Sequence, residues 1–238
     1  MTIYDPTMQV LTLLPWYDWL ALAWFFSAWA GYAWFARHGG MRRASLLATT
    51  NRHRRYWMLQ ATARDPRVLD GIIIQSLSSS PSFFASATII IMGGLLALLG
   101  TTDKAAEFVR EIPFATRTSM AVFELKVLVL LGIFVNAFFR FTWSMRQYTF
   151  AALVIGSMPN PEDFAQGKFE REHFADRAGK LLGMAAETFN DGIRAYYFSF
   201  AAIAWFFSPL VFAVATALVV GVLYTREFHS EVLHALRD

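Results

Sequence analysis

The chain has 238 residues, of which 56% are hydrophobic and 16% aromatic, and its formal net charge is +3. This is the composition of a membrane protein rather than of a soluble protein with a large core. The chain has no cysteine, which excludes disulfides, thiolate metal sites, iron–sulfur clusters and c-type haem attachment.

Four long apolar stretches predict transmembrane helices over about 16–36, 82–100, 119–139 and 198–224. Each is close to, or longer than, the ~20 residues that a helix needs to cross roughly 30 Å of hydrocarbon. With their connecting segments they use nearly the whole chain, which leaves no room for a separate soluble domain. We therefore predict an all-α, polytopic membrane protein with a single integral membrane domain over residues 1–238.

The distribution of charge predicts the orientation. Fifteen basic residues lie in two long segments, one between the first and second stretches and one running from Arg140 to Arg194. Five basic residues lie on the other side. Those five are Lys104, Arg110, Arg117, Arg226 and Arg237. By the positive-inside rule both long segments lie in the cytoplasm, and both chain ends lie outside. In a Gram-negative host this describes a multi-pass protein of the inner membrane.

The first and fourth stretches carry small residues at four-residue spacing. They are Ala23, Ser27 and Gly31 in the first stretch, and Ala213, Ala217 and Gly221 in the fourth. Such stripes let helices approach closely, either within one chain or between subunits. Pro209 lies inside the fourth stretch, where its missing backbone donor predicts a kink.

A basic, aromatic run lies in the first cytoplasmic segment and includes Arg52, Arg54, Arg55 and Trp57. Clustered arginines with aromatic neighbours suit anionic lipid headgroups beside a membrane. The simpler interpretation is that these charges only set the topology, since inner segments are rich in Lys and Arg.

A serine-rich segment leads into the second stretch, with Pro81 in its middle. The polar positions that share or adjoin one helix face are Gln75, Ser78, Ser79, Ser82 and Ser86. Small hydroxyls either support close helix packing or line a wet path for ions. We expect an extended or broken helix that reaches the membrane from the cytoplasm.

The third stretch ends in Asn136 and Arg140, which share a helix face and have phenylalanines around them. An arginine there needs a partner, and Asp70 and Asp191 are predicted at a similar depth; with Arg194 they form a candidate intramembrane polar network. Arg140 has three interpretations: contact with lipid phosphate, a structural ion pair, or a role in transport or binding. The helix is expected to continue into the cytoplasm until the prolines at 159 and 161.

Residues 168–186 place apolar side chains at helical spacing, which predicts an amphipathic helix on the membrane or on a partner helix. Glu170, His173 and Asp176 recur at three-residue steps, but the charged face of a solvated helix has the same pattern. We therefore expect no metal and no cofactor.

Two stretches carry a family resemblance. The first is residues 70–100, with Gly-Ile-Ile-Ile-Gln-Ser at 71–76, and the second is Phe-Asn-Asp-Gly-Ile-Arg-Ala-Tyr-Tyr-Phe at 189–198. Together with Asn-Ala-Phe-Phe-Arg-Phe at 136–141, they resemble the four-span membrane proteins classed as domain of unknown function 599, found in bacteria and plants. The resemblance covers roughly residues 19–230. It implies an integral membrane protein and supplies no activity.

Three functions remain open. The first is a homo-oligomeric channel or transporter, in which the serine-rich face lines the path and Arg140 favours anions. The second is a membrane scaffold or assembly factor that binds a membrane-protein partner through its cytoplasmic segments. The third is a lipid-modifying enzyme using His53, Asp70, His173, Glu187 or Asp191, against which we find no catalytic motif. Nucleic-acid binding is not expected.

Overall fold

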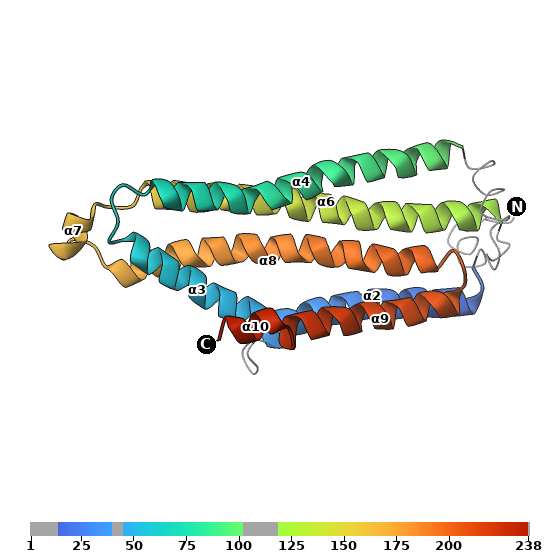
Figure 1. Cartoon of the computed structure of the whole chain (residues 1–238). Coiled ribbons are helices and arrows are strands. Elements are labelled where there is room, and N and C mark those ends of the chain that lie inside the picture. Colours follow the sequence, from blue (N-terminus) through green and yellow to red (C-terminus); the bar gives the residue numbers. More distant parts are fainter. Residues whose placement is uncertain (1–13, 40–44, 102–118, 238) are drawn as a thin grey trace, which may run out of the picture.

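The structure is a computed structural model that describes residues 14–39, 45–101 and 119–237, and every regular element in these residues is a helix. The long helices lie lengthwise in an elongated bundle (Figure 1). They are α2 (Trp16–Gly39), α4 (Val68–Gly100), α6 (Met120–Gly156), α8 (Arg171–Ala204) and α9 (Pro209–Phe228). The short helices are α3 (Leu46–Ala61), α7 (Pro161–Ala165) and α10 (Glu231–Ala235). Five basic residues used above, Arg42, Arg43, Lys104, Arg110 and Arg117, lie outside the described residues.

Three helical segments of the described chain are long and apolar enough to cross a membrane: Val68–Gly100, Met120–Gly156 and Pro209–Ala235. The predicted all-α, membrane-type fold is confirmed. The first predicted stretch forms α2, whose 24 residues include many Trp and Tyr side chains that suit a membrane interface.

Two of the long helices extend well beyond the predicted spans. α4 begins at Val68, well before residue 82, which agrees with the extended helix expected there. α6 continues past residue 139 to Gly156 and ends before the prolines at 159 and 161, as predicted. At 1.5 Å per residue they are about 50 Å and 55 Å long, more than the roughly 30 Å of hydrocarbon. Their extra turns, together with α3, α7 and residues 171–190 of α8, form what we call the helical extension (Figure 1).

The predicted amphipathic helix is the first half of α8, and it packs on other helices of the chain. Ala175, Ala178 and Leu182 are buried in one cluster with Met58 of α3 and Tyr148 of α6. Two glycines permit the close contact with α3, because a Cβ on Gly179 would lie 3.0 Å from the Arg55 Cα, and one on Gly183 would lie 2.9 Å from the Asn51 Oδ1. The extension is therefore a helical bundle and not a surface helix lying on lipid.

The fourth predicted span is not one helix. α8 ends at Ala204, the chain turns through residues 205–207, and α9 runs back beside α8 (Figure 1). Pro209 does not kink a helix, because it occupies the first turn of α9, where a backbone donor is not required. Ser208 caps that turn through the bond from the Val211 amide to its Oγ.

The turn after α8 changes where the ends of the chain lie. The start of α2 and the end of α9 are at opposite ends of the bundle (Figure 1). Four crossings would place them at the same end, as the N-out/C-out prediction required. The aromatic turn Trp205-Phe206-Phe207 has no charge or glycine to interrupt the apolar run, so the sequence shows one stretch where the structure has two helices. The number of crossings and their orientation stay predictions.

The small-residue stripes of α2 and α9 lie along one groove. Ser27, Gly31, Ala217 and Gly221 are among the residues that line this cavity of about 610 Å³. The indole of Trp24 bridges the two helices by donating to the Ala213 carbonyl at 3.2 Å. The stripes thus support packing within the chain, and a subunit contact there stays a prediction.

Candidate functional site

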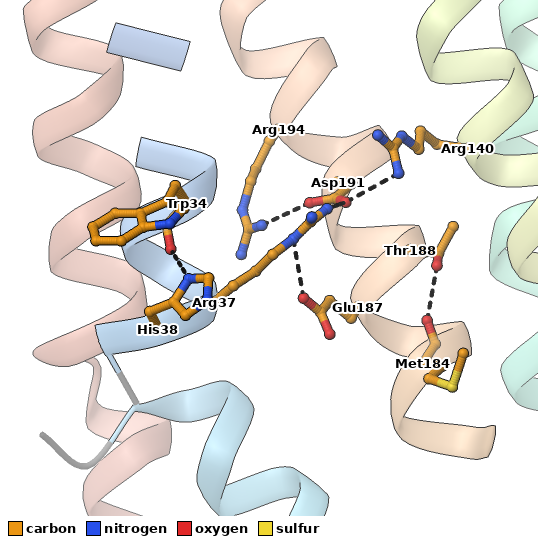
Figure 2. Close-up of polar contacts among 9 residues, drawn as sticks. All are labelled: Trp34, Arg37, His38, Arg140, Met184, Glu187, Thr188, Asp191 and Arg194. Atoms are coloured by element: carbon orange, nitrogen blue, oxygen red, sulfur yellow. Dashed lines mark hydrogen bonds and ion pairs between the residues drawn. The ribbon is translucent and has the colours of Figure 1, made fainter. Parts of the chain in front are cut away.

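The site is built around one carboxylate on α8. Arg37 of α2 and Arg140 of α6 both contact Oδ2 of Asp191, and the Arg140 Nη1 lies 3.4 Å from it. Arg194, one turn further along α8, donates from Nη1 to the other oxygen at 2.8 Å. Three helices therefore converge on a single carboxylate (Figure 2).

The cluster has more positive than negative charge. Glu187 lies one turn before Asp191 and is 3.2 Å from Nε of Arg37, so three guanidiniums meet two carboxylates, a formal charge of +1. Arg194 is 6% exposed and its guanidinium lies over the Tyr32 ring at 5.8 Å. Its role is structural. The Arg37 and Arg140 side chains are 42% and 44% exposed, and each has five N–H donors.

The distance of the cluster from the helix starts matches the thickness of a bilayer. Arg140 follows the start of α6 at Met120 by twenty residues, about 30 Å of helix, which matches the hydrocarbon thickness. Arg37 follows the start of α2 at Trp16 by a similar length. The cluster thus marks the level at which the helical extension begins.

A lateral groove leads from the cluster along the bundle. It is a cavity of about 510 Å³ between α2 and α6. The residues that line it are Phe26, Trp29, Ala30, Ala33, Val129, Gly132, Ile133, Asn136 and Arg140. All are apolar except the last two, which lie one turn apart at the end next to Asp191. The side-chain amide of Asn136 forms no hydrogen bond with any other described residue.

This arrangement suits an amphiphilic ligand. An apolar groove shields a hydrocarbon chain, and an arginine and an amide at one end supply donors to an anionic head. The described residues around the groove hold no nucleophile beside a base, and no group of His, Asp and Glu placed to hold a metal is found among the described residues.

The predicted polar network is only partly assembled. Arg140, Asp191 and Arg194 meet as described, and Asn136 lines the adjoining groove. Asp70 belongs elsewhere: it is fully buried in the helical extension, where its Oδ1 accepts from the Trp57 indole at 2.7 Å and lies 3.2 Å from Arg64. It lies in the first turn of α4, within the helical extension, which explains the separation.

The predicted path residues face outward in a single chain. Gln75, Ser79 and Ser86 are exposed and Ser78 and Ser82 are half-buried. The buried face of α4 is a different one, and it carries Ile74, Pro81, Ala85 and Thr88. The Ser79 and Ser86 hydroxyls donate to carbonyls of their own helix, at 2.6 and 3.1 Å. One chain therefore encloses no path along these serines.

The predicted headgroup contacts on α3 have other partners. Arg54 donates to Asn51 Oδ1 at 2.8 Å, and Trp57 donates to Asp70. Arg55 pairs with Asp176 of α8, and this hydrogen bond holds the pKa of the Asp176 carboxyl below its ordinary value. Arg52 is exposed. These four residues do not form a single outward basic face.

Sequence reasoning missed two residues of the cluster. In the sequence, Arg37 contributes only to the basic residues that set the topology, and Glu187 appears only as a candidate residue of a lipid-modifying enzyme. A signal was present, because Glu187, Asp191 and Arg194 are spaced at i, i+4 and i+7 and so share one face of a helix. The Gly179-x-x-x-Gly183 spacing similarly indicated a close helix contact.

Comparison with known proteins gives a family and no further relative. The family model described as protein of unknown function, DUF599, matches residues 20–232, which is most of the chain. No curated protein and no solved structure matches the chain.

Proposed function

We propose, from the premise that this chain belongs to the DUF599 family of proteins of unknown function, that it binds a bilayer lipid in the groove between α2 and α6. The supporting observation is the junction of an apolar, laterally open groove with half-exposed guanidiniums at interface depth. Lipids supply the two matching parts, an acyl chain and a polar head, at the same depth.

Filling the groove tests this function. Gly132 lines the groove, and a Cβ added to it would meet no atom within 4 Å, so Gly132→Trp places an indole in the lipid's position without disturbing the core. Gly94→Trp is the matched control, because Gly94 is also exposed on a long helix, α4, outside this groove. Native mass spectrometry of protein purified in mild detergent should find retained lipid in the wild type and in Gly94→Trp, and little in Gly132→Trp. Equal retention in all three contradicts the proposal.

A homo-oligomeric channel or transporter is the second candidate. It is supported by the exposed polar face of α4, since Gln75, Ser79 and Ser86 are free to meet the same face of another copy. Arg140 would not be its filter, because that residue lines the α2–α6 groove. A defined oligomer, with reconstituted ion flux that is lost in Ser82→Leu, is the expected result; a monomer without flux for any ion contradicts it.

A scaffold role is the alternative to both. It is supported by Tyr56 and Leu69 on the helical extension and by Phe169 just before α8, large side chains that are more than half exposed. Exposed apolar surface outside the hydrocarbon is typical of protein contacts. A stoichiometric membrane-protein partner in a pull-down from native membranes is expected, and its loss in Leu69→Asp would locate the contact.

We also propose that the helical extension lies in the cytoplasm and that the protein belongs to an inner membrane. Most of the basic residues are on the extension side. The structure supports adding Arg226 and Arg237 to that side, because α10 packs on α3 and the His53 ring lies 3.0 Å from the Leu236 carbonyl. The positive-inside rule then favours this orientation more strongly than the sequence order alone.

A further inference from the structure

The charges at the end of the α2–α6 groove specify the headgroup, an inference that rests on the proposed lipid-binding function. We infer that the groove selects an anionic phospholipid, whose phosphate bridges Arg37 and Arg140. Arg37 belongs to α2 and Arg140 to α6, the two helices between which the groove lies, and Arg140 lines it. Both arginines contact the same oxygen, Oδ2 of Asp191 (Figure 2).

The single oxygen Oδ2 of Asp191 leaves several N–H donors of Arg37 and Arg140 without an acceptor in this cluster. Arg140 makes a single contact of 3.4 Å to Asp191, which is longer than a normal hydrogen bond, and its side chain is 44% exposed. A phosphate offers two unesterified oxygens and is well suited to paired guanidiniums, because each planar fork can donate twice. Arg194 continues to satisfy Oδ1 of Asp191, so that this carboxylate keeps a partner when the phosphate is bound.

The charge count favours one negative charge. The cluster has a formal charge of +1, and a singly charged phosphodiester brings it to zero. The cationic group of a zwitterionic lipid would leave the site with its charge of +1. Glu187 does not neutralise that group, because it is already paired with Arg37 at 3.2 Å. At the edge of the hydrocarbon such unbalanced charge is weakly screened and therefore unfavourable.

The groove also provides for the rest of the lipid. Asn136 lies one turn from Arg140 toward the membrane, and its amide is placed to bond the ester or glycerol oxygens next to a phosphate. Beyond it, Phe26, Trp29 and Val129 line the apolar part, which extends about 16 Å along α6 from Arg140. The phosphate of the lipid thus meets the guanidiniums, its ester linkage meets the Asn136 amide, and its acyl chain meets the apolar wall of the groove.

Lipid titration tests the inference. Delipidated protein is titrated with phosphatidylglycerol and, separately, with phosphatidylcholine of the same acyl chains. We expect phosphatidylglycerol to bind about tenfold more tightly to the wild type, as loss or gain of one charge-assisted contact implies. Arg140→Gln should lose this preference while it still binds lipid, and Arg140→Lys should recover part of it. Arg146→Gln is the matched control on the exposed side of the same helix, and it should behave as the wild type.

Each contrary result has a distinct meaning. Equal affinity for the two lipids in the wild type overturns the headgroup inference and leaves the lipid-binding function standing. No affinity for either lipid overturns both. Inorganic phosphate binding as tightly as phosphatidylglycerol assigns the cluster to a soluble anion and overturns its assignment to a lipid. If Arg140→Gln does not fold, Arg37→Gln is titrated in its place and should show the same loss of preference.

Discussion

The indole of Trp205 donates to the carboxylate of Asp18, with Nε1 2.6 Å from Oδ1, although 187 residues separate them in the chain. Both side chains are buried. The bond joins the turn between α8 and α9 to the first turn of α2, and the same turn is held from α6, because Lys126 Nζ donates to the Trp205 carbonyl at 2.8 Å. These two contacts anchor the reversal that replaces a single fourth span.

The first prediction concerns this bond. Asp18→Ala removes the acceptor of a buried indole N–H, so the free energy of unfolding should fall by about 1–3 kcal/mol. Thermal unfolding in detergent of Asp18→Ala, Trp205→Phe and the double variant forms a double-mutant cycle. The two effects should be clearly less than additive, since either change alone breaks the bond. Strict additivity would show that the two side chains do not interact.

The second prediction concerns topology, and the cysteine-free chain makes it direct to test. Single cysteines at Arg52 and Glu231 should react with a membrane-impermeant maleimide from one side of the membrane, and a cysteine at Tyr17 from the other. All three positions are exposed, and α10 packs on α3. Labelling of Glu231→Cys from the same side as Tyr17→Cys would restore the four-crossing arrangement and contradict the turn after α8.

The third prediction concerns Asp191. Asp191→Asn leaves three guanidiniums without their shared carboxylate, and we expect a loss of several kcal/mol in stability, because removing one partner of a buried pair is strongly unfavourable. The charge swap Arg140→Asp with Asp191→Arg should not rescue it, since Arg37 and Arg194 would then face an arginine. Recovery of folded protein in the swap, measured by size-exclusion chromatography, would show that Arg140 is the dominant partner.

The fourth prediction concerns a close contact of α6 and α8 at Gly192. A Cβ on Gly192 would lie 2.4 Å from Cε1 of the fully buried Phe141 ring, so Gly192→Ala forces the ring to move. We expect a loss of about 1–3 kcal/mol in unfolding free energy, as for other overpacked cores. Gly93→Ala is the control, because its Cβ meets no atom within 4 Å and alanine favours a helix. Similar melting temperatures for the two variants would contradict this packing.

The fifth prediction is a pH dependence in the helical extension. The hydrogen bond from Arg55 lowers the pKa of Asp176, so the pair stabilises the fold above the unfolded pKa of about 4, and this contribution is lost as the pH falls through the folded value. Melting temperatures of the wild type and Asp176→Asn should differ slightly at pH 7 and converge in acid. A difference that persists well below the unfolded pKa would assign the effect to something other than the carboxylate charge.

Much of the fold could be predicted from local sequence. Apolar length predicts the membrane-type helices, and the end of α6 before Pro159 and Pro161 follows from the chemistry of proline. Helical spacing predicted that Asn136 and Arg140 share one helix face. The position of Arg140 in an apolar run indicated that its guanidinium needs a carboxylate partner. Asp191 was one of the two carboxylates expected at that depth, and the structure pairs it with Arg140.

Other features depend on contacts that no local pattern contains. Hydropathy cannot separate an apolar turn from an apolar span, so the reversal at Trp205 is visible only through its partners Asp18 and Lys126. Residue type alone suggested functional roles for the serine face of α4, the arginines of α3 and Asp70. Which groups surround these residues depends on the helices that pack beside them.

The sequence by itself determined that this protein is helical, membrane-embedded and asymmetric in charge, because hydrocarbon thickness and backbone hydrogen bonding act on each segment separately. The tertiary structure alone decided that Arg37, Arg140 and Arg194 share Asp191 and that a groove opens beside them. Those residues come from three helices, and their convergence depends on how the helices pack, a property of pairs of segments that no single segment encodes.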